Sequence, residues 1–292
     1  MKRLVLILVV VVWATETRAL NLIVPNDHAL TPGDGGNGYP FALAYYDTQH
    51  FVQVYDASQF GVLGTNGGTI NAIAFRGSST STKMVYSVTL YLSTTSYAVD
   101  GLNTDMSGDL GPDNKRVFTG NFTLNAISGS LPQPLPFDVV IPLQNSFFYN
   151  PTNGNLLLYM TISDSSGTEY AQPYVDTVQS SSDSVSRKHW DAFDTHTWVD
   201  SYGAVTQFGI VPAVAPKPQV SSFAPSNTNL IATGTGGSGG LIYCVLMSTN
   251  LGISVTNWVP VLTNAFDSTG NFSFTNAVDP ALPQQFFRLQ IQ

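Results

Sequence analysis

The chain has 292 residues, of which 43% are hydrophobic, 12% aromatic and only 10% charged, and its formal net charge is −8 at pH 7. An acidic chain repels nucleic-acid phosphates, and no lysine- and arginine-rich run is present for an anionic lipid surface, so neither partner is expected. The single cysteine excludes an internal disulfide, and its apolar neighbours predict that Cys244 is a small buried core residue.

The N-terminus has the layout of a secretory signal peptide. The basic start MKR is followed by an apolar run from Leu4 to Ala14 and by a polar stretch that ends in Ala19. The run is shorter than the roughly 20 apolar residues of a membrane span. We therefore expect cleavage after Ala19 and export, with an uncleaved N-terminal anchor as the alternative. Residues 20–292 hold 8 basic and 18 acidic residues, a formal charge of −10.

Short segments that alternate in the manner of β-strands follow one another through residues 20–211. They are rich in β-branched and aromatic residues, which pack well on a pleated surface. Turn sequences such as DGLN, GDLGPDN, NPTNGN and DSSGT separate them. The segments are HFVQVYDA (50–57), TINAIAFRG (69–77), MVYSVTLYLST (84–94), RVFTGNFTL (116–124), FDVVIPL (137–143), NLLLYMTIS (155–163) and AVTQFGIV (204–211). Without helical crossovers, this pattern predicts an all-β fold, an antiparallel β-sandwich of jelly-roll-like topology.

A proline-rich stretch divides this region from a second, smaller β module. VPAVAPKPQV (211–220) contains three prolines and almost no charge, which is typical of a stiff extended linker. We predict a signal peptide at 1–19, a β-sandwich domain at 20–211, a linker at 212–218 and a C-terminal module at 219–292. The strands expected in that module are NLIATG, GLIYCVLMST, NWVPVLTN, GNFSFTN and QQFFRLQI, with TGTGGSGG as a flexible connection.

Several segments resemble known exported proteins. VYDASQF, GGTINAIAFR, LYLSTT, VFTG, PFDVVIPL, FFYNPTNGNLLL, SDSVSR and VTQFG together resemble a family of exported bacterial proteins, many of which carry a C-terminal sorting tag. VLMSTNL, NWVPVLTN, FDSTGNFSFTN and FFRLQ are similar to a recurrent module at the ends of large secreted bacterial proteins. The resemblance implies exported β modules and carries over no functional residue. The tag itself, a Pro-Glu-Pro motif with an apolar helix and a basic end, does not occur in this sequence.

The segment RKHWDAFDTHTW (187–198) gathers two histidines, two aspartates and two tryptophans. His189, Asp191, Asp194 and His196 offer nitrogen and oxygen ligands, but their spacing matches neither a helical histidine pair nor a zinc motif. On a strand, His189 and Asp191 would share one face and the other two residues the opposite face. We favour a solvated loop with Trp190 and Trp198 partly packed on the sandwich, and keep a metal or catalytic cluster as the alternative.

Two oxygen-rich stretches are candidates for calcium, which prefers six to eight oxygen ligands. In DGLNTDMSGDLGPDN the weak metal candidates are Asp100, Asp105, Asp109 and Asp113, with Asn103 and Asn114 beside them. A second candidate is the set Asp27, Asp34 and Asn37. Turns rich in aspartate, asparagine and glycine are the alternative account of both stretches. No other cofactor is expected.

Two glycine-rich motifs match by composition alone. Gly234 to Gly239 fits the dinucleotide pattern G-x-G-x-x-G, and Gly236 to Gly240 fits the nucleophile pattern G-x-S-x-G. Both motifs require a helix directly after the loop. The residues that follow, GLIYCVLM, predict a strand instead, so both matches are interpreted as loop glycines.

The sequence favours a non-catalytic structural or interaction protein of the cell exterior. A glycoside hydrolase needs two carboxylates across a cleft, and Glu169 is the only glutamate of residues 20–292, with no evident partner. Sugar binding is the stronger alternative, because exposed aromatic rings can stack on sugars. Trp190, Trp198 and Tyr202 are the ligand-binding candidates, since the tryptophans have charged neighbours. The expected partner is then a glycan or a cell-surface protein.

Overall fold

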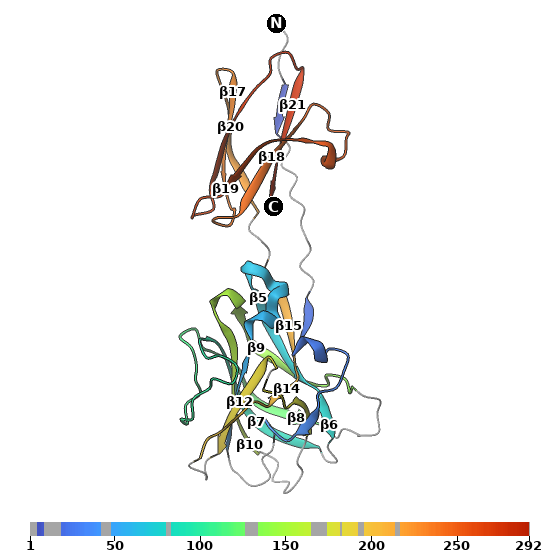
Figure 1. Cartoon of the computed structure of the whole chain (residues 1–292), viewed down its shortest axis with the longest axis vertical. Helices are drawn as coiled ribbons and strands as arrows, with labels where there is room; N and C mark the ends of the chain where they lie inside the picture. Colours follow the sequence, from blue (N-terminus) through green and yellow to red (C-terminus); the bar gives the residue numbers. More distant parts are fainter. Residues whose placement is uncertain are drawn as a thin grey trace. The chain divides into compact units, whose positions relative to one another are not determined.

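The computed structural model describes residues 5–8, 19–41, 48–79, 83–125, 134–164, 174–181, 183–191, 196–213 and 217–291 (Figure 1). Its elements are β-strands and short 3-10 helices, and the sheets are antiparallel apart from one strand pair. The predicted all-β sandwich is confirmed. Within these residues no helix has the length and apolar character to cross a membrane. The chain divides into two compact units, one of Thr17–Ala213 and one of Met1–Glu16 with Val214–Gln292.

The first unit contains two large sheets and one small sheet. The six-stranded sheet has the order β13 (Trp198–Asp200), β12 (Val185–Asp191), β4 (Gln49–Tyr55), β10 (Asn155–Asp164), β7 (Met84–Thr95) and β8 (Lys115–Leu124). The four-stranded sheet has the order β2 (Leu20–Val24), β15 (Thr206–Pro212), β5 (Gly68–Phe75) and β9 (Val139–Tyr149). The small sheet consists of β14 (Gly203–Ala204), β11 (Tyr174–Val178) and β3 (Gly35–Asn37), with β6 (Gly77–Ser79) also pairing with β11. The 3-10 helices are η1 (Asn26–His28), η2 (Ala57–Asn66) and η3 (Pro151–Asn153).

The core of this unit lies between the two large sheets. Strand β7 shows how the sequence builds it, because alternate residues are buried: Tyr86, Val88, Leu90 and Leu92 point inward. They meet inward residues of the four-stranded sheet, such as Phe208 on β15. This alternation is the one that the sequence predicts, since successive side chains of a strand point to opposite faces.

A loop covers part of the outer face of the six-stranded sheet. Residues 96–114, between β7 and β8, bring Leu102 onto Val52, Val54, Leu157 and Trp190 of that face. The covered strands are therefore buried on both faces, which explains why the apolar run of β10 is nearly continuous. The loop itself contains the oxygen-rich stretch of the sequence.

The second unit is a smaller pair of sheets. One contains β16 (Gln219–Ser226), β17 (Asn229–Thr235) and β20 (Phe272–Ala277). The other has the order β1 (Val5–Leu8), β21 (Gln284–Ile291), β18 (Ile242–Ser248) and β19 (Val259–Ala265), and β1 pairs with β21 in parallel. The 3-10 helix η4 (Val255–Asn257) precedes β19. Tyr243, Phe272 and Phe287 form the core between these sheets, and Cys244 is buried and unpaired, as predicted.

The predicted strands correspond closely to observed ones. The seven segments of residues 50–211 map onto β4, β5, β7, β8, β9, β10 and the pair β14 and β15. The main difference concerns residues 187–191. The sequence favours a solvated loop over 187–198, whereas the structure has β12 (Val185–Asp191), a strand paired on both sides and largely buried. Polar residues are compatible with a buried strand here because the loop 96–114 and residues 198–202 supply partners for them.

Candidate functional site

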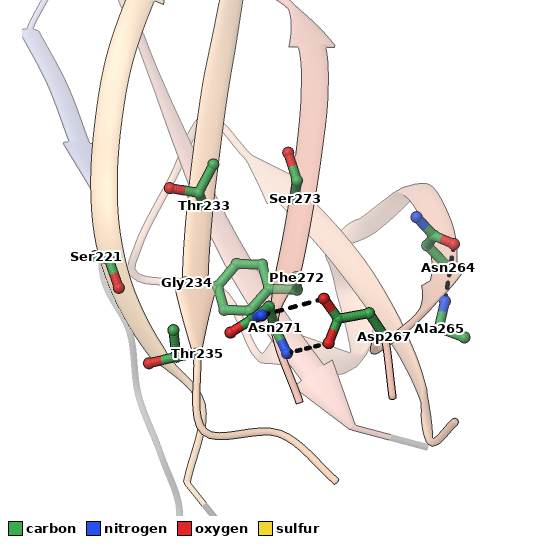
Figure 2. Close-up of a pocket in the computed structure, with 10 residues that line it drawn as sticks. All are labelled: Ser221, Thr233, Gly234, Thr235, Asn264, Ala265, Asp267, Asn271, Phe272 and Ser273. Atoms are coloured by element: carbon green, nitrogen blue, oxygen red, sulfur yellow. Dashed lines mark hydrogen bonds between the residues drawn. The ribbon is translucent and has the colours of Figure 1, made fainter. Parts of the chain in front are cut away.

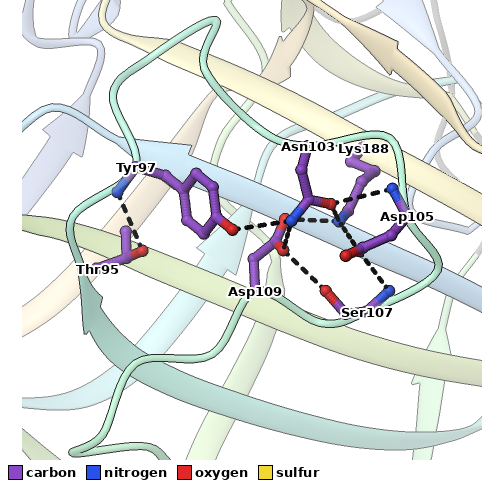
Figure 3. Close-up of polar contacts among 7 residues, drawn as sticks. All are labelled: Thr95, Tyr97, Asn103, Asp105, Ser107, Asp109 and Lys188. Carbon is purple, nitrogen blue, oxygen red and sulfur yellow. Dashed lines mark hydrogen bonds and ion pairs between the residues drawn. The ribbon is translucent and has the colours of Figure 1, made fainter.

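The most densely bonded polar site is centred on Lys188 (Figure 3). Its ammonium is fully buried on the outer face of β12, and Nζ donates to Asp109 Oδ2 at 2.5 Å and to Asn103 Oδ1 at 3.1 Å. Asn103 Nδ2 donates to Asp109 Oδ1 and to the hydroxyl of Tyr97, both at 2.8 Å. The Asp109 side chain is only 1% exposed. A buried lysine and a buried carboxylate thus contact each other and the half-buried amide of Asn103.

Apolar groups surround this site. Trp190 lies over the ammonium, with Nζ 5.6 Å from the ring, and Leu102 and Val52 belong to the same apolar cluster. Burying a charge in such surroundings is costly unless it is paired and hydrogen-bonded. The Lys188–Asp109 pair therefore fixes the loop 96–114 to β12.

The four aspartates proposed as calcium ligands take separate positions along the loop. Asp105 and Asp109 both contact Lys188, at 3.5 Å and 2.5 Å. Asp113 Oδ1 accepts the N–H of Thr94, while Asp100 donates its backbone N–H to a serine hydroxyl of β12. The ammonium of Lys188 lies beside the carboxylates for which the sequence predicts a calcium ion. Calcium binding to this stretch stays a prediction.

A second polar cluster lies at the edge of the same sheet, on its opposite face. Arg187, buried on β12, donates to both carboxylate oxygens of Asp200 at 2.9 and 3.0 Å and to Asn37 Oδ1 at 3.0 Å. Its guanidinium lies 5.2 Å from the ring centres of Tyr39 and of Tyr202. Asn37, a predicted calcium ligand, and Tyr202, a predicted sugar-binding residue, thus both contact Arg187.

The two tryptophans of the segment 187–198 do not lie together. Trp198 pairs in register with His189, so both project from the face of Arg187, whereas Trp190 projects from the opposite face. Trp198 is 54% exposed and its ring lies 4.7 Å from that of His196. Trp190 is only 6% exposed, contrary to the expectation from its charged neighbours, because the loop 96–114 covers it.

Trp190 instead begins an aromatic row across the outer face. Its ring is parallel to that of His50 at 4.7 Å, and His50 stacks on Tyr159 at 6.0 Å. Tyr159 stacks in turn on Tyr91 at 6.0 Å, so the row crosses β12, β4, β10 and β7. The alignment of these rings depends on strand pairing, which the sequence does not display.

The histidine–aspartate cluster is also divided. His189 stacks on Tyr39 at 3.8 Å, and burial lowers its pKa from 6.5 to about 4. His196 is exposed beside Trp198, and Asp194 lies outside the described residues, as does Glu169. In the parts of the chain that the structure describes, no three His, Cys, Asp or Glu side chains are grouped to hold a metal.

The second unit contains an open pocket of about 520 Å³ (Figure 2). Hydroxyl and amide side chains line it, among them Thr233, Thr235, Asn264 and Asn271, beside the ring of Phe272. Asp267 shapes its rim: the carboxylate accepts four hydrogen bonds from Thr269 and Asn271, and these lower its pKa to about 2. A lining of neutral donors and acceptors beside one aromatic ring suits a neutral polar ligand.

The glycines of the two matched motifs lie in the loop after β17, as interpreted, except Gly234, which lies within that strand. Gly237 to Gly240 connect β17 with strand β18, so the helix that either motif requires does not follow them. Gly234 lies in β17 beneath Phe272, and a Cβ there would meet that ring at 2.3 Å. Its role is close packing.

Two titratable groups, the half-buried Asp183 and the buried His189, give opposite pH dependences. Burial raises the pKa of Asp183 from 3.8 to about 6, so the folded chain keeps a proton that the unfolded chain releases. Stability from this group therefore falls as the pH rises from 4 to 6. The pH dependence from His189 has the opposite sign. The unfolded chain binds a proton at His189 near pH 6.5, whereas the folded chain binds it only near pH 4. Its contribution is complete above pH 6.5 and is lost as the pH falls.

We expect the two contributions to separate in single variants. In Asp183→Asn the melting temperature should rise more steeply between pH 4 and 6.5 than in the parent chain, because only the His189 contribution remains. In His189→Phe, which keeps a ring against Tyr39, the melting temperature should rise less or fall. Differences of several degrees are expected, since 1 kcal/mol shifts the midpoint by about 2–4 °C in a unit of this size. Identical pH slopes in all three proteins would contradict the two assignments.

Comparison with protein-family models and with curated proteins finds no match to this chain. The function is therefore argued from the geometry alone.

Proposed function

We propose that the chain is an exported, non-catalytic structural or interaction protein of the cell exterior. The observation that carries this proposal is that the buried cations of the described residues form ion pairs that join loops and edge strands to the sheets. Arg76, Arg187 and Lys188 are the buried cations of the described residues, and each contacts a carboxylate. Each joins a loop or an edge strand to a sheet. Buried ion pairs that join loops and edge strands to a sheet are suited to holding a scaffold together.

The edge of β21 supports the interaction part of the proposal. Residues 284–287 pair in parallel with Val5–Leu8, so this edge accepts an added strand. If residues 1–19 are removed on export, the same edge loses its neighbour. Exposed strand edges readily bind an extended segment of another chain through main-chain hydrogen bonds.

Export is tested by expressing the whole chain in a bacterial host and determining the N-terminus of the product by mass spectrometry. We expect a chain that begins at Leu20 outside the cytoplasm. The variant Val9→Arg, which interrupts the apolar run, should remain inside the cell with residues 1–19 intact. A parent chain that stays in the cytoplasm uncleaved would overturn the proposal.

Carbohydrate binding is the second candidate, and two surfaces favour it. One is the exposed ring of Trp198 on β13, and the other is the half-buried aromatic row that ends at Tyr91. Planar rings beside polar groups are suited to sugars.

A glycan array with purified protein distinguishes the two candidates. A signal that Trp198→Ala or Tyr91→Ala abolishes would establish sugar binding and identify its surface. Phe148→Ala is the matched control, because Phe148 is an equally exposed aromatic residue on another strand, β9. The structural proposal expects no signal that depends on either ring.

A further inference from the structure

Three reactive groups meet in the Lys188 site (Figure 3). Lys188 carries a primary amine, Asn103 a carboxamide and Asp109 a carboxyl group. Nζ contacts Asn103 Oδ1 at 3.1 Å, and the two carboxylate oxygens face different nitrogens: Oδ2 faces Nζ at 2.5 Å, and Oδ1 faces Asn103 Nδ2 at 2.8 Å. One carboxyl group therefore bridges an amine and the nitrogen of the neighbouring amide.

The orientation of the amide is fixed by its other partners. Asn103 Nδ2 donates to Tyr97 Oη as well as to Asp109, so the carbonyl end of the amide is directed to Nζ. Held at contact distance, the amine and the carbonyl have the proximity that converts a slow intermolecular reaction into a fast intramolecular one.

Burial favours the reaction. Lys188 is 0% exposed and the Asp109 side chain 1%, within the apolar cluster that contains Trp190 and Leu102. Low polarity favours transfer of the Nζ proton to the carboxylate, because two neutral groups need less solvation than two ions. Asn103 itself is half-buried, so its amide lies at the rim of this cluster, where the released ammonia can leave.

We propose that Lys188 and Asn103 become joined by an intramolecular amide bond, with Asp109 as the proton carrier. The Nζ proton passes to Asp109 Oδ2, and the free electron pair of Nζ attacks Asn103 Cγ to form a C–N bond. The carboxyl group takes a second proton from Nζ and gives one to Nδ2. The bond from Cγ to Nδ2 then breaks and ammonia leaves, while Asp109 keeps one proton. No oxidant, metal or cofactor takes part.

The bond would connect two distant parts of the chain. Asn103 and Lys188 are 85 positions apart, so the link would attach the loop 96–114 to β12 covalently. Cross-links between distant residues stabilise chiefly by restricting the unfolded chain. The inference is independent of export and of sugar binding.

High-resolution mass spectrometry of the intact, folded chain tests it. We expect the purified protein to be lighter than its sequence by one ammonia, and proteolysis to give a branched peptide that joins Asn103 to Lys188. Lys188→Met and Asn103→Ala should each have the full mass of their sequences. Asp109→Asn keeps the amine and the amide and should also have the full mass, with folding checked by circular dichroism.

Asp105→Asn is the matched control. The Asp105 side chain contacts Lys188 at 3.5 Å but is 62% exposed, and the hydrogen bond from Asp105 to Asn103 Oδ1 is made by the backbone N–H, which the substitution keeps. This variant should keep the loss of ammonia. A folded parent chain of full mass would overturn the proposal. A loss of ammonia that persists in Lys188→Met, or a loss of water that joins Lys188 to Asp109, would do the same.

Discussion

Replacing Arg76 by methionine should lower the free energy of unfolding of the first unit by about 3–5 kcal/mol, because it leaves a buried carboxylate without its cation. Arg76 follows β5 and is 1% exposed, and its Nε lies 3.4 Å from Asp176 Oδ2. Its other nitrogens donate to the carbonyls of His28 and Thr31 at 2.6 and 3.0 Å. Methionine fills part of the volume but provides none of these contacts.

The measurement is urea denaturation at pH 7. Arg116→Met is the control, since Arg116 is exposed on β8 and such surface changes usually stay within about 0.5 kcal/mol. Burial raises the pKa of Asp176, so lowering the pH should protonate it and reduce the penalty in the Arg76 variant. A loss below about 1 kcal/mol would mean that solvent reaches the pair.

Truncating one core should destabilise one unit and leave the other unchanged. Phe208 is fully buried, with its ring 5.0 Å from Tyr55 and 5.4 Å from Phe60. Phe287 is fully buried in the separate core of the second unit. We expect Phe208→Ala and Phe287→Ala each to cost about 3–5 kcal/mol in their own unit, from lost burial and the cavity left behind.

Hydrogen exchange in denaturant, followed by peptide mass spectrometry, reports the two units separately. Phe208→Ala should increase exchange in the core strands of Thr17–Ala213 only, and Phe287→Ala in those of Val214–Gln292 only. The control Phe148→Ala should change neither, because that ring is 55% exposed. If either core variant accelerated exchange in both units equally, the chain would have one cooperative core instead of two.

Strands with a clear period of two were predictable from the sequence alone. MVYSVTLYLST appears as β7 nearly to the residue, since its β-branched and aromatic residues pack well on a pleated surface. NLLLYMTIS appears as β10, a nearly continuous apolar run, as expected of a strand that is buried on both faces. The strands β3, β6 and β13 are not evident in the sequence, because three residues are too few to show an alternating pattern. Their backbone pairs with strands that only the folded chain brings near.

The carboxylates of the candidate site were predictable from the sequence, but their pairing with Lys188 was not. The oxygen-rich stretch 100–114 is visible in the sequence, and calcium was a reasonable interpretation of its carboxylates. Lys188, which pairs with two of them, lies 79 positions after Asp109, in a segment whose local sequence favours a solvated loop. Trp190 was missed as a buried residue for the same reason, since its cover comes from residues 96–114.

The sequence by itself determined the class of fold, the strand segments and the burial of Cys244, because each follows from composition and local periodicity. Only the tertiary structure decided which charged side chains are buried, and that Lys188, Asn103 and Asp109 contact one another. A charged side chain is buried only where residues distant in the sequence supply its partners. Those long-range contacts cannot be predicted from local composition and periodicity.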